Sequence, residues 1–192
     1  MRRIITTLAK KTDRKRWADI GNIYADWEPR TKIVAALVPN NSRVIEFGAG
    51  HRNLEGYLDP SCTYVPSDLV DRGPGTIVCD LNKRPLPDLG QDVYDVAVAI
   101  GVLEYLDDVP AVLDWLTKYV KLCVLACAPA RTNGYSPRAI AETIVRARHG
   151  WMNSYREDEI LALFRERGFE LVRDEDWKTQ RLYVFAQRPS AG

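Results

Sequence analysis

The sequence lacks the features that would assign it to a membrane or to an oxidising compartment. No stretch approaches the ~20 apolar residues that a membrane span needs, and no apolar segment follows the first arginines, which argues against a secretory signal. None of the four cysteines falls in a Cys-x-x-Cys pair, so buried reduced thiols are favoured over disulfides or zinc ligands. We therefore expect a cytoplasmic protein with no membrane span and no metal site.

The sequence also lacks an excess of charge of either sign. Its 27 basic and 26 acidic residues leave a formal net charge of +1, which gives no clear signal for nucleic acid. One local bias exists, because basic residues crowd the start of the chain, where Asp13 is the first acid. Such an arm could touch phosphate, but a solvated helix face with Ile4, Ile5 and Leu8 turned inward is the preferred interpretation.

From Arg43 onward the sequence alternates between short apolar segments and amphipathic segments. Short apolar segments predict buried strands, and amphipathic segments with cap signals predict helices between them. Alternating strands and helices indicate an α/β fold: a single doubly wound, mostly parallel, Rossmann-like sheet of seven strands with helices on both faces. We expect strands at 43–47, 62–66, 75–79, 94–100, 121–128, 169–172 and 181–186, and helices at 53–58, after Asp107 and Asp108, from Ser136, and from Ser154 to Gly168.

The segment "RVIEFGAGHRNLEGYL" (43–58) reads as a strand that runs into a turn with two glycines. In such sheets the first strand-helix turn borders the ligand crevice, and Gly48 and Gly50 let the backbone approach a ligand closely. A dinucleotide fingerprint would place its third glycine at Asn53, and Glu46 is a poor neighbour for a pyrophosphate. The turn therefore favours a ligand that presents a cation or hydroxyl groups.

The motif "VIEFGAG" resembles the first motif of the class I (Rossmann-like) S-adenosylmethionine-dependent methyltransferases. The likeness runs from about Arg43 to Gln187 and includes "YVPSDLV", "TIVCDLNKRPLP" and "YDVAVAIGVLEYL", in the family's order. The ending "RGFELVRDEDWKTQRLYVFAQ" is similar to the family's antiparallel terminal hairpin. The family's usual third glycine is replaced by Arg52. The resemblance implies an S-adenosylmethionine-dependent methyltransferase.

The resemblance also implies which residues would hold S-adenosylmethionine. Glu46 and the glycine turn would cradle the amino-acid and ribose part, Asp68 would accept both ribose hydroxyls, and Asp80 would bond the adenine amino group. The end of the fourth strand would lie beside the methyl donor. The implied cofactor-binding set is Glu46, Gly48, Ala49, Gly50, His51, Asp68, Leu69, Asp80, Leu81, Ile100 and Gly101.

No single catalytic residue is predicted. A sulfonium carries its own leaving group, so a base is needed only if the acceptor must lose a proton. The candidates are His51 in the glycine turn, and Tyr105 and Glu104 after the fourth strand. The chain lacks the Asn/Asp-Pro-Pro-Tyr and Pro-Cys motifs of many methyltransferases that act on nucleic acid, and it lacks an acidic cluster for magnesium. We expect a small or medium, polar or sugar-like acceptor, methylated on oxygen or nitrogen.

Two parts of the chain would close the acceptor pocket: the N-terminal helices and the segment after the fifth strand. Residues 1–42 are expected to form N-terminal helices that act as a lid or cap, and 43–192 the cofactor-binding part of the same structural domain. The aromatic residues of the first part could equally be ordinary helix-packing residues. The substrate-binding candidates are Trp17, Tyr24, Arg131 and Tyr135.

Two other functions stay open at this point. One is a module that binds S-adenosylmethionine but has lost catalysis, which the irregular glycine turn and the missing base favour slightly. The other is a nicotinamide-dependent oxidoreductase, which the missing third glycine and Glu46 weaken.

Overall fold

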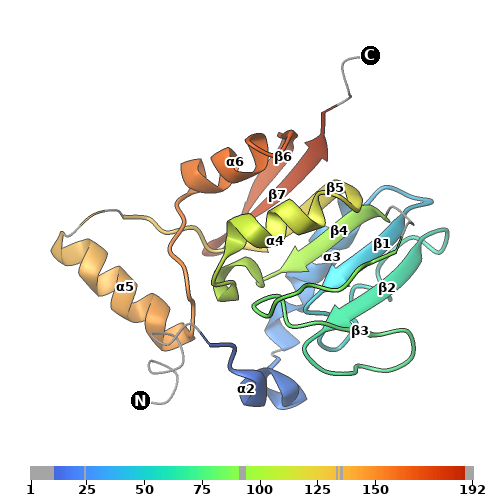
Figure 1. Cartoon of the computed structure of the whole chain (residues 1–192), viewed down its shortest axis with the longest axis horizontal. Helices are drawn as coiled ribbons and strands as arrows, with labels where there is room; N and C mark the ends of the chain where they lie inside the picture. The colour runs from blue at the N-terminus through green and yellow to red at the C-terminus, as the bar shows by residue number, and fades with distance from the viewer. Residues whose placement is uncertain (1–10, 24, 91–93, 133, 135, 189–192) are drawn as a thin grey trace.

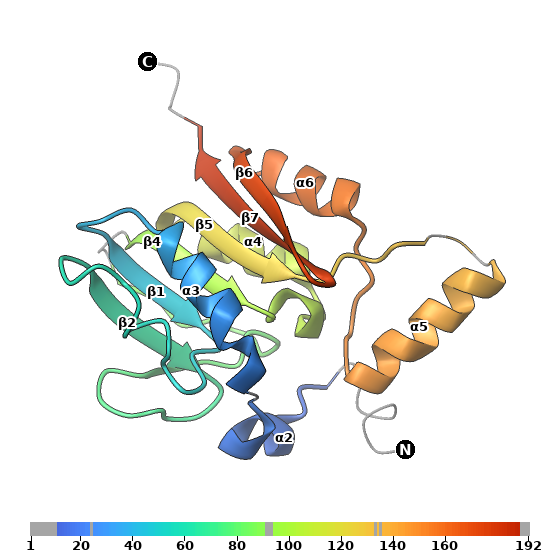
Figure 2. The same cartoon turned by 180° about the vertical axis from the view of Figure 1, so that it is seen from behind.

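The computed structural model describes residues 11–23, 25–90, 94–132, 134 and 136–188. They form a seven-stranded sheet in the order β3-β2-β1-β4-β5-β7-β6, with helices on both faces (Figures 1 and 2). Strand β7 runs antiparallel to β5 and β6, and the other neighbours are parallel. The predicted Rossmann-like sheet with its antiparallel terminal hairpin is confirmed.

The strands are close to their predicted positions, and the terminal hairpin is longer than expected. Their bounds are β1 (Arg43–Phe47), β2 (Thr63–Asp68), β3 (Ile77–Val78), β4 (Tyr94–Ile100), β5 (Val120–Cys127), β6 (Phe169–Trp177) and β7 (Gln180–Gln187). The helices are α2 (Arg14–Ala18), α3 (Glu28–Ala36), α4 (Val109–Leu116), α5 (Pro137–His149) and α6 (Glu157–Arg165), with 3₁₀ turns η1 (Ile20–Asn22), η2 (Ala25–Trp27) and η3 (Leu103–Tyr105).

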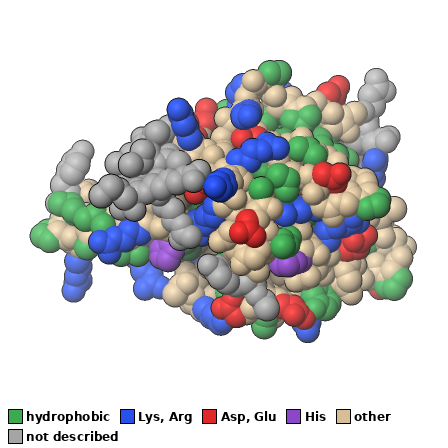
Figure 3. Space-filling view, turned by 90° about the horizontal axis from the view of Figure 1, so that it is seen from below, with side chains coloured by type: hydrophobic (Ala, Val, Ile, Leu, Met, Phe, Trp, Pro, Cys, Tyr) green, Lys and Arg blue, Asp and Glu red, His purple; other side chains and the backbone are tan. Residues whose placement is uncertain are grey.

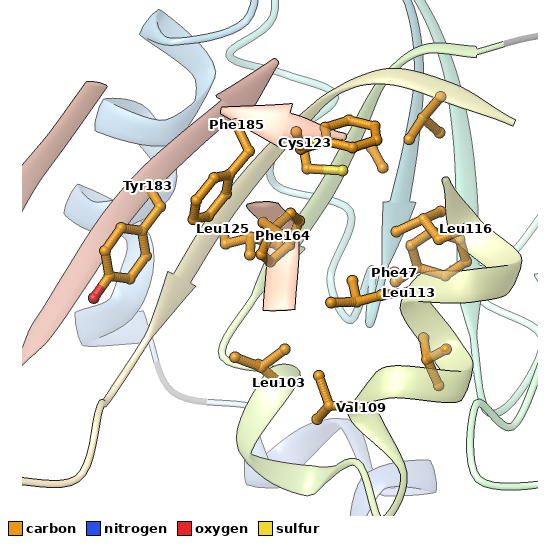
Figure 4. Close-up of a cluster of buried hydrophobic side chains, with 14 of the residues drawn as sticks. Phe47, Leu103, Val109, Leu113, Leu116, Cys123, Leu125, Phe164, Tyr183 and Phe185 are labelled. Carbon is orange, nitrogen blue, oxygen red and sulfur yellow. The ribbon is translucent and has the colours of Figure 1, made fainter. Parts of the chain in front are cut away.

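Two apolar clusters hold the helices on the sheet. On one face, Val34 and Ala35 of α3 pack with buried valines of β1, β4 and β5. On the other, α4 and α6 pack over β4, β5 and β7, where the ring of Phe164 stacks on Phe185 with centroids 3.9 Å apart (Figure 4). Each fully buried side chain of this size contributes about 1.5–3 kcal/mol. This packing fixes the carboxyl ends of the central strands.

Local cap signals set the starts of two helices as predicted. The Asp108 carboxylate accepts the Ala111 N–H at 3.0 Å at the start of α4. The Ser136 hydroxyl accepts the Ala139 N–H at 3.2 Å before Pro137, the first residue of α5. Such a cap contributes about 1 kcal/mol.

The predicted start of α6 at Ser154 is wrong. The helix begins at Glu157, and the Glu159 carboxylate accepts the N–H of Arg156, its N-cap, at 2.8 Å. The reason is a tertiary contact: Ala130 donates its N–H to the Tyr155 carbonyl at 2.8 Å, and a parallel bridge joins Ala130 to Arg156. These bonds keep the chain extended through the predicted first turn.

The predicted helix at 53–58 is also wrong. These residues form consecutive hydrogen-bonded turns, with Tyr57 and Leu58 donating to the Leu54 carbonyl. The segment is short, contains Gly56, and ends before Pro60, which disfavours helical geometry at Asp59. The crossover from β1 to β2 therefore has no helix of its own. Other parts of the chain, including the N-terminal segment, border the crevice above β1.

Helix α5 stands apart from the sheet (Figures 1 and 2). Its buried Arg146 ties it down by donating to the Ala128 carbonyl at 2.9 Å and to the Asn153 carbonyl. Hydrophobic side chains gather on the surface at this end of the molecule (Figure 3), and Ile140 and Ile144 are about half exposed. Among the described residues, no helix combines the length and the apolar character needed to cross a bilayer.

Candidate active site

The carboxyl ends of β1, β2 and β4 open into a cavity of about 880 Å³. Ligand cavities usually measure about 300–1,000 Å³, so this one has room for a nucleoside-sized ligand and a small second molecule. The fold brings together at its wall all of the residues predicted to hold the cofactor: Glu46, Gly48, Ala49, Gly50, His51, Asp68, Leu69, Asp80, Leu81, Ile100 and Gly101.

The glycine turn needs both of its glycines. Gly48 and Gly50 have φ angles of +73° and +53°, a region that L-residues avoid. A Cβ on Gly48 would lie 2.7 Å from Cγ2 of Val102, and one on Gly50 would lie 2.9 Å from Cδ1 of Ile23. The Gly48 N–H also donates to the Ser67 carbonyl at 2.8 Å, which holds the turn against β2.

Arg52 has the left-handed backbone geometry that favours glycine. Its φ is +59°, so a non-glycine residue carries the left-handed geometry. The guanidinium points to the far side of the turn, where it donates to Glu55 and, at 3.1 Å, to the Pro74 carbonyl. Arg52 does not line the cavity, whereas the exposed His51 does.

Glu46 is a buried carboxyl group at the end of β1. It is 4% exposed, and its Oε2 accepts the Tyr64 hydroxyl at 2.5 Å. Burial raises the pKa of Glu46 to about 8, although the bond from Tyr64 and the charge of Arg30 act in the opposite direction. A carboxyl of this kind stays largely protonated at neutral pH until a cation arrives.

Asp68 connects the turn to the rest of the site. Its carboxylate accepts the Gly50 N–H at 2.9 Å and forms an ion pair with Arg72, whose Nε lies at 3.2 Å. Arg72 also donates to the Trp17 carbonyl. Arg72 Nη2 also donates to Oδ1 of Asp68 at 3.4 Å. A carboxylate has about four acceptor positions, so Asp68, which lines the cavity, keeps acceptor capacity for ligand hydroxyl groups.

Asp80 holds the N-terminal segment across the end of β3. Its Oδ1 accepts the Thr12 hydroxyl at 2.9 Å and the Asn82 N–H at 3.1 Å. Six residues of 11–23 line the cavity: Lys11, Thr12, Asp13, Arg16, Trp17 and Ile23. Helix α3 contributes Glu28, Arg30 and Thr31 to the cavity wall, and its second half packs on the sheet through Val34 and Ala35.

An aromatic wall faces the end of β4. Trp17 packs edge to face on Tyr105 with ring centroids 4.9 Å apart, and the Arg16 guanidinium lies 4.2 Å from the Trp17 ring. Trp151 and Met152 complete this wall. Burial raises the pKa of Tyr105, so its phenol stays protonated and offers a hydrogen-bond donor.

The other predicted substrate residues are not all in this cavity. Tyr24 and Tyr135 lie outside the described residues. Arg131 is exposed and lines a second hollow with Arg156 and Arg181; this hollow shares Lys178, Thr179 and Gln180 with the large cavity, which Arg131 does not line.

Two buried charged groups at the cavity wall were not among the predicted binding residues, although Glu104 was a predicted candidate base. Arg30 of α3 is 5% exposed and donates to Oε1 of Gln180 at 2.5 Å. Glu104 of η3 is 2% exposed, and its Oε1 accepts the Ala128 N–H at 2.7 Å. The Leu-Glu pair in the fourth-strand motif pointed to Glu104, but no pattern in the sequence marked Arg30.

The comparisons with known proteins agree with this architecture. A family model described as "Methyltransferase domain" matches residues 1–174. A search of the curated proteins found no match. Among solved structures, the chain is similar to magnesium protoporphyrin IX methyltransferase from Synechocystis PCC 6803 with bound SAM, at 16% identity over 96% of this chain and 95% of that one, with a TM-score of 0.60.

Two further structures share the fold at similar distance. An O-methyltransferase family protein from Burkholderia thailandensis is 15% identical over 91% of this chain and 60% of that one, with a TM-score of 0.70. Mitomycin 7-O-methyltransferase is 16% identical over 86% of this chain and 55% of that one, with a TM-score of 0.62. At these identities the likeness concerns the fold.

Proposed function

The chain belongs to the methyltransferase family whose domain spans its residues 1–174, and on that premise we propose that it transfers the methyl group of S-adenosylmethionine to oxygen or nitrogen of a small or medium polar acceptor. The observation that carries the proposal is the meeting of Glu46, Gly48, Asp68, Asp80 and Gly101 at one cavity. These residues come from the ends of four different strands or the turns that follow them, and together they present the donor and acceptor groups that this cofactor requires.

Each group has a role that suits its surroundings. The Glu46 carboxyl would ionise beside the ammonium group of the cofactor, and the open backbone at Gly48 would let the amino-acid part approach. Asp68 would accept the ribose hydroxyls, and Asp80 the adenine amino group. When bound, the sulfonium supplies a methyl group that is already activated, so the protein mainly orients the acceptor in line with it.

Glu104 is the candidate base for an acceptor that must lose a proton. Among the described residues its Oε2 has no hydrogen-bond partner, although the group is buried at the cavity wall. Burial raises the pKa of Glu104, which makes the carboxylate a stronger proton acceptor. Glu104→Gln should lower kcat for a hydroxyl acceptor and remove the acidic limb of its pH profile, where protonation of the base stops the reaction, while Kd for the cofactor stays unchanged.

The wall opposite the cofactor residues suggests the acceptor class. Trp17, Tyr105, Trp151 and Met152 offer flat, polarisable surfaces, which suit a planar ring or the apolar face of a sugar. The names of the mitomycin and magnesium protoporphyrin enzymes support ring-containing acceptors for this fold. We also infer a cytoplasmic location, because all four cysteines are free thiols.

The test is calorimetric titration with S-adenosylhomocysteine. Wild-type protein should bind it, and Asp68→Ala should weaken binding by about 10-fold or more, because two charge-assisted hydrogen bonds are lost. Asp158→Ala, which removes an exposed carboxylate on α6, is the matched control. Absence of binding by the wild-type protein would refute the proposal, and binding without transfer to any acceptor in a broad library would favour a binding module.

A further inference from the structure

Arg30 places a buried positive charge at the wall of the cavity. The side chain is 5% exposed. Among the described residues no carboxylate lies within 4.0 Å of its nitrogens, and its Nε has no hydrogen-bond partner. Asp26, Glu46 and Glu104 act on it only from a greater distance. A buried cation without a counter-ion is costly. The ligand-free protein therefore lacks a close anionic partner for the Arg30 guanidinium.

The guanidinium is held rigidly from two sides of the fold. It lies 5.4 Å from the ring centroid of Trp27 and 5.5 Å from that of Trp177, which belong to η2 and to β6. Its Nη1 donates to Gln180 at the start of β7. A planar guanidinium fixed in this way keeps a defined set of N–H donors for a ligand.

The position of the charge is also defined. A Cβ built on Gly101 would lie 3.5 Å from Nη1 of Arg30, so the guanidinium sits against bare backbone at the end of β4. Gly101 has a φ of +69°, and both residues line the cavity. A ligand that reaches Gly101 therefore also reaches Arg30.

We infer that Arg30 binds a carboxylate in this cavity, an inference that rests on the proposed function and adds the chemical class that the site recognises. Arg30 forms charge-assisted hydrogen bonds to that group, and the ligand supplies the counter-ion that the protein lacks. The carboxylate comes from one of two sources: the methionyl part of the cofactor or an acidic acceptor.

Calorimetry with paired ligands separates these sources. The ligands are S-adenosylhomocysteine and its decarboxylated form, which keeps the adenosine and the amine. If Arg30 binds the cofactor, Arg30→Met should weaken S-adenosylhomocysteine about 10–100-fold and the decarboxylated form less than about 2-fold. Arg138→Met, at an exposed arginine of α5, is the control and should change neither.

If Arg30 binds the acceptor, S-adenosylhomocysteine should bind both proteins equally. Wild-type protein saturated with it should then bind benzoate in preference to benzamide, and Arg30→Met should lose this preference. No change in either experiment would overturn the inference, and so would an equal loss of both adenosine ligands, which indicates a structural role. Failure of the wild-type protein to bind either adenosine ligand would overturn the proposed function as well.

Stability provides a second readout. Because Arg30 is an uncompensated charge, ligand-free Arg30→Met should melt no lower than Arg138→Met. If Arg30→Met does not fold, the role of Arg30 is structural and the inference is overturned, unless Arg30→Lys folds and shows the same selective loss of the carboxylate ligand.

Discussion

Binding of the cofactor product should release a proton from Glu46. The pKa of this buried carboxyl is raised to about 8 by desolvation, so about nine-tenths of the molecules carry the proton at pH 7. An ammonium group within a few ångströms lowers a carboxyl pKa by ~1–3 units. The bound carboxyl should then be at least half ionised at pH 7, which corresponds to release of about 0.4 to 0.9 proton.

Calorimetry in two buffers measures this number directly. Titrations of S-adenosylhomocysteine at pH 7 in phosphate and in Tris differ in apparent enthalpy in proportion to the protons released. Glu46→Gln should remove the difference, and at pH 9 the wild-type protein should release about 0.1 proton or less. Equal heats in the two buffers for wild-type protein, or the same release from Glu46→Gln, would refute the assignment of the ammonium group to Glu46.

The ligand-free protein offers an independent test of the same carboxyl. The raised pKa means that native protein holds the proton more tightly than unfolded protein. The stability that Glu46 contributes is therefore complete below the unfolded pKa of about 4.5 and is lost as the pH rises through about 8. Glu46→Gln should flatten this part of the stability profile, measured by urea denaturation at several pH values.

Three further predictions concern the turn and the core. Gly48→Ala should lower the free energy of unfolding, measured by urea denaturation, by about 2–4 kcal/mol, because the residue is left-handed and its Cβ overlaps Val102. Adding Val102→Ala should restore only part of this loss, and no recovery at all would contradict the contact. Arg52→Gly should change the free energy of unfolding by no more than about 1 kcal/mol, since the lost ion pair with Glu55 is offset by the lost strain of a left-handed φ at a non-glycine residue. A 10-fold loss of S-adenosylhomocysteine affinity in calorimetry would show that Arg52 does reach the ligand. Phe164→Ala should cost about 3–5 kcal/mol in urea denaturation, and a cost below about 1 kcal/mol would contradict its stacked position in the core.

The sequence predicted those parts of the fold that depend on neighbouring residues. The caps at Asp108 and Ser136 act within one helical turn. Ser136 was predicted as a cap, and Asp107 and Asp108 were predicted at the start of the other helix. The start of α6 was wrong because the bridge to Ala130 joins segments that are far apart in the chain. Tertiary hydrogen bonds of this kind override a local capping pattern.

The same distinction applies to the site. The cofactor residues lie at the ends of parallel strands, where motif and topology both constrain position, and they meet at one cavity. Arg30 reaches it from a helix outside the motifs, and its partner Gln180 lies in the terminal hairpin. Neither residue belongs to a periodic pattern, so only the assembled fold shows that the two meet.

The N-terminal segment has a consequence for the rate of turnover. Thr12 bonds to Asp80, the Trp17 carbonyl bonds to Arg72, and Ile23 contacts Gly50. A nucleoside that occupies these positions can leave only when residues 11–23 move aside. The same segment also meets the aromatic wall of the acceptor pocket, where Trp17 packs on Tyr105 and Arg16 donates to the His149 carbonyl at 2.7 Å. Cofactor and acceptor should therefore both depend on movement of residues 11–23, so that this movement, rather than methyl transfer, limits the turnover rate.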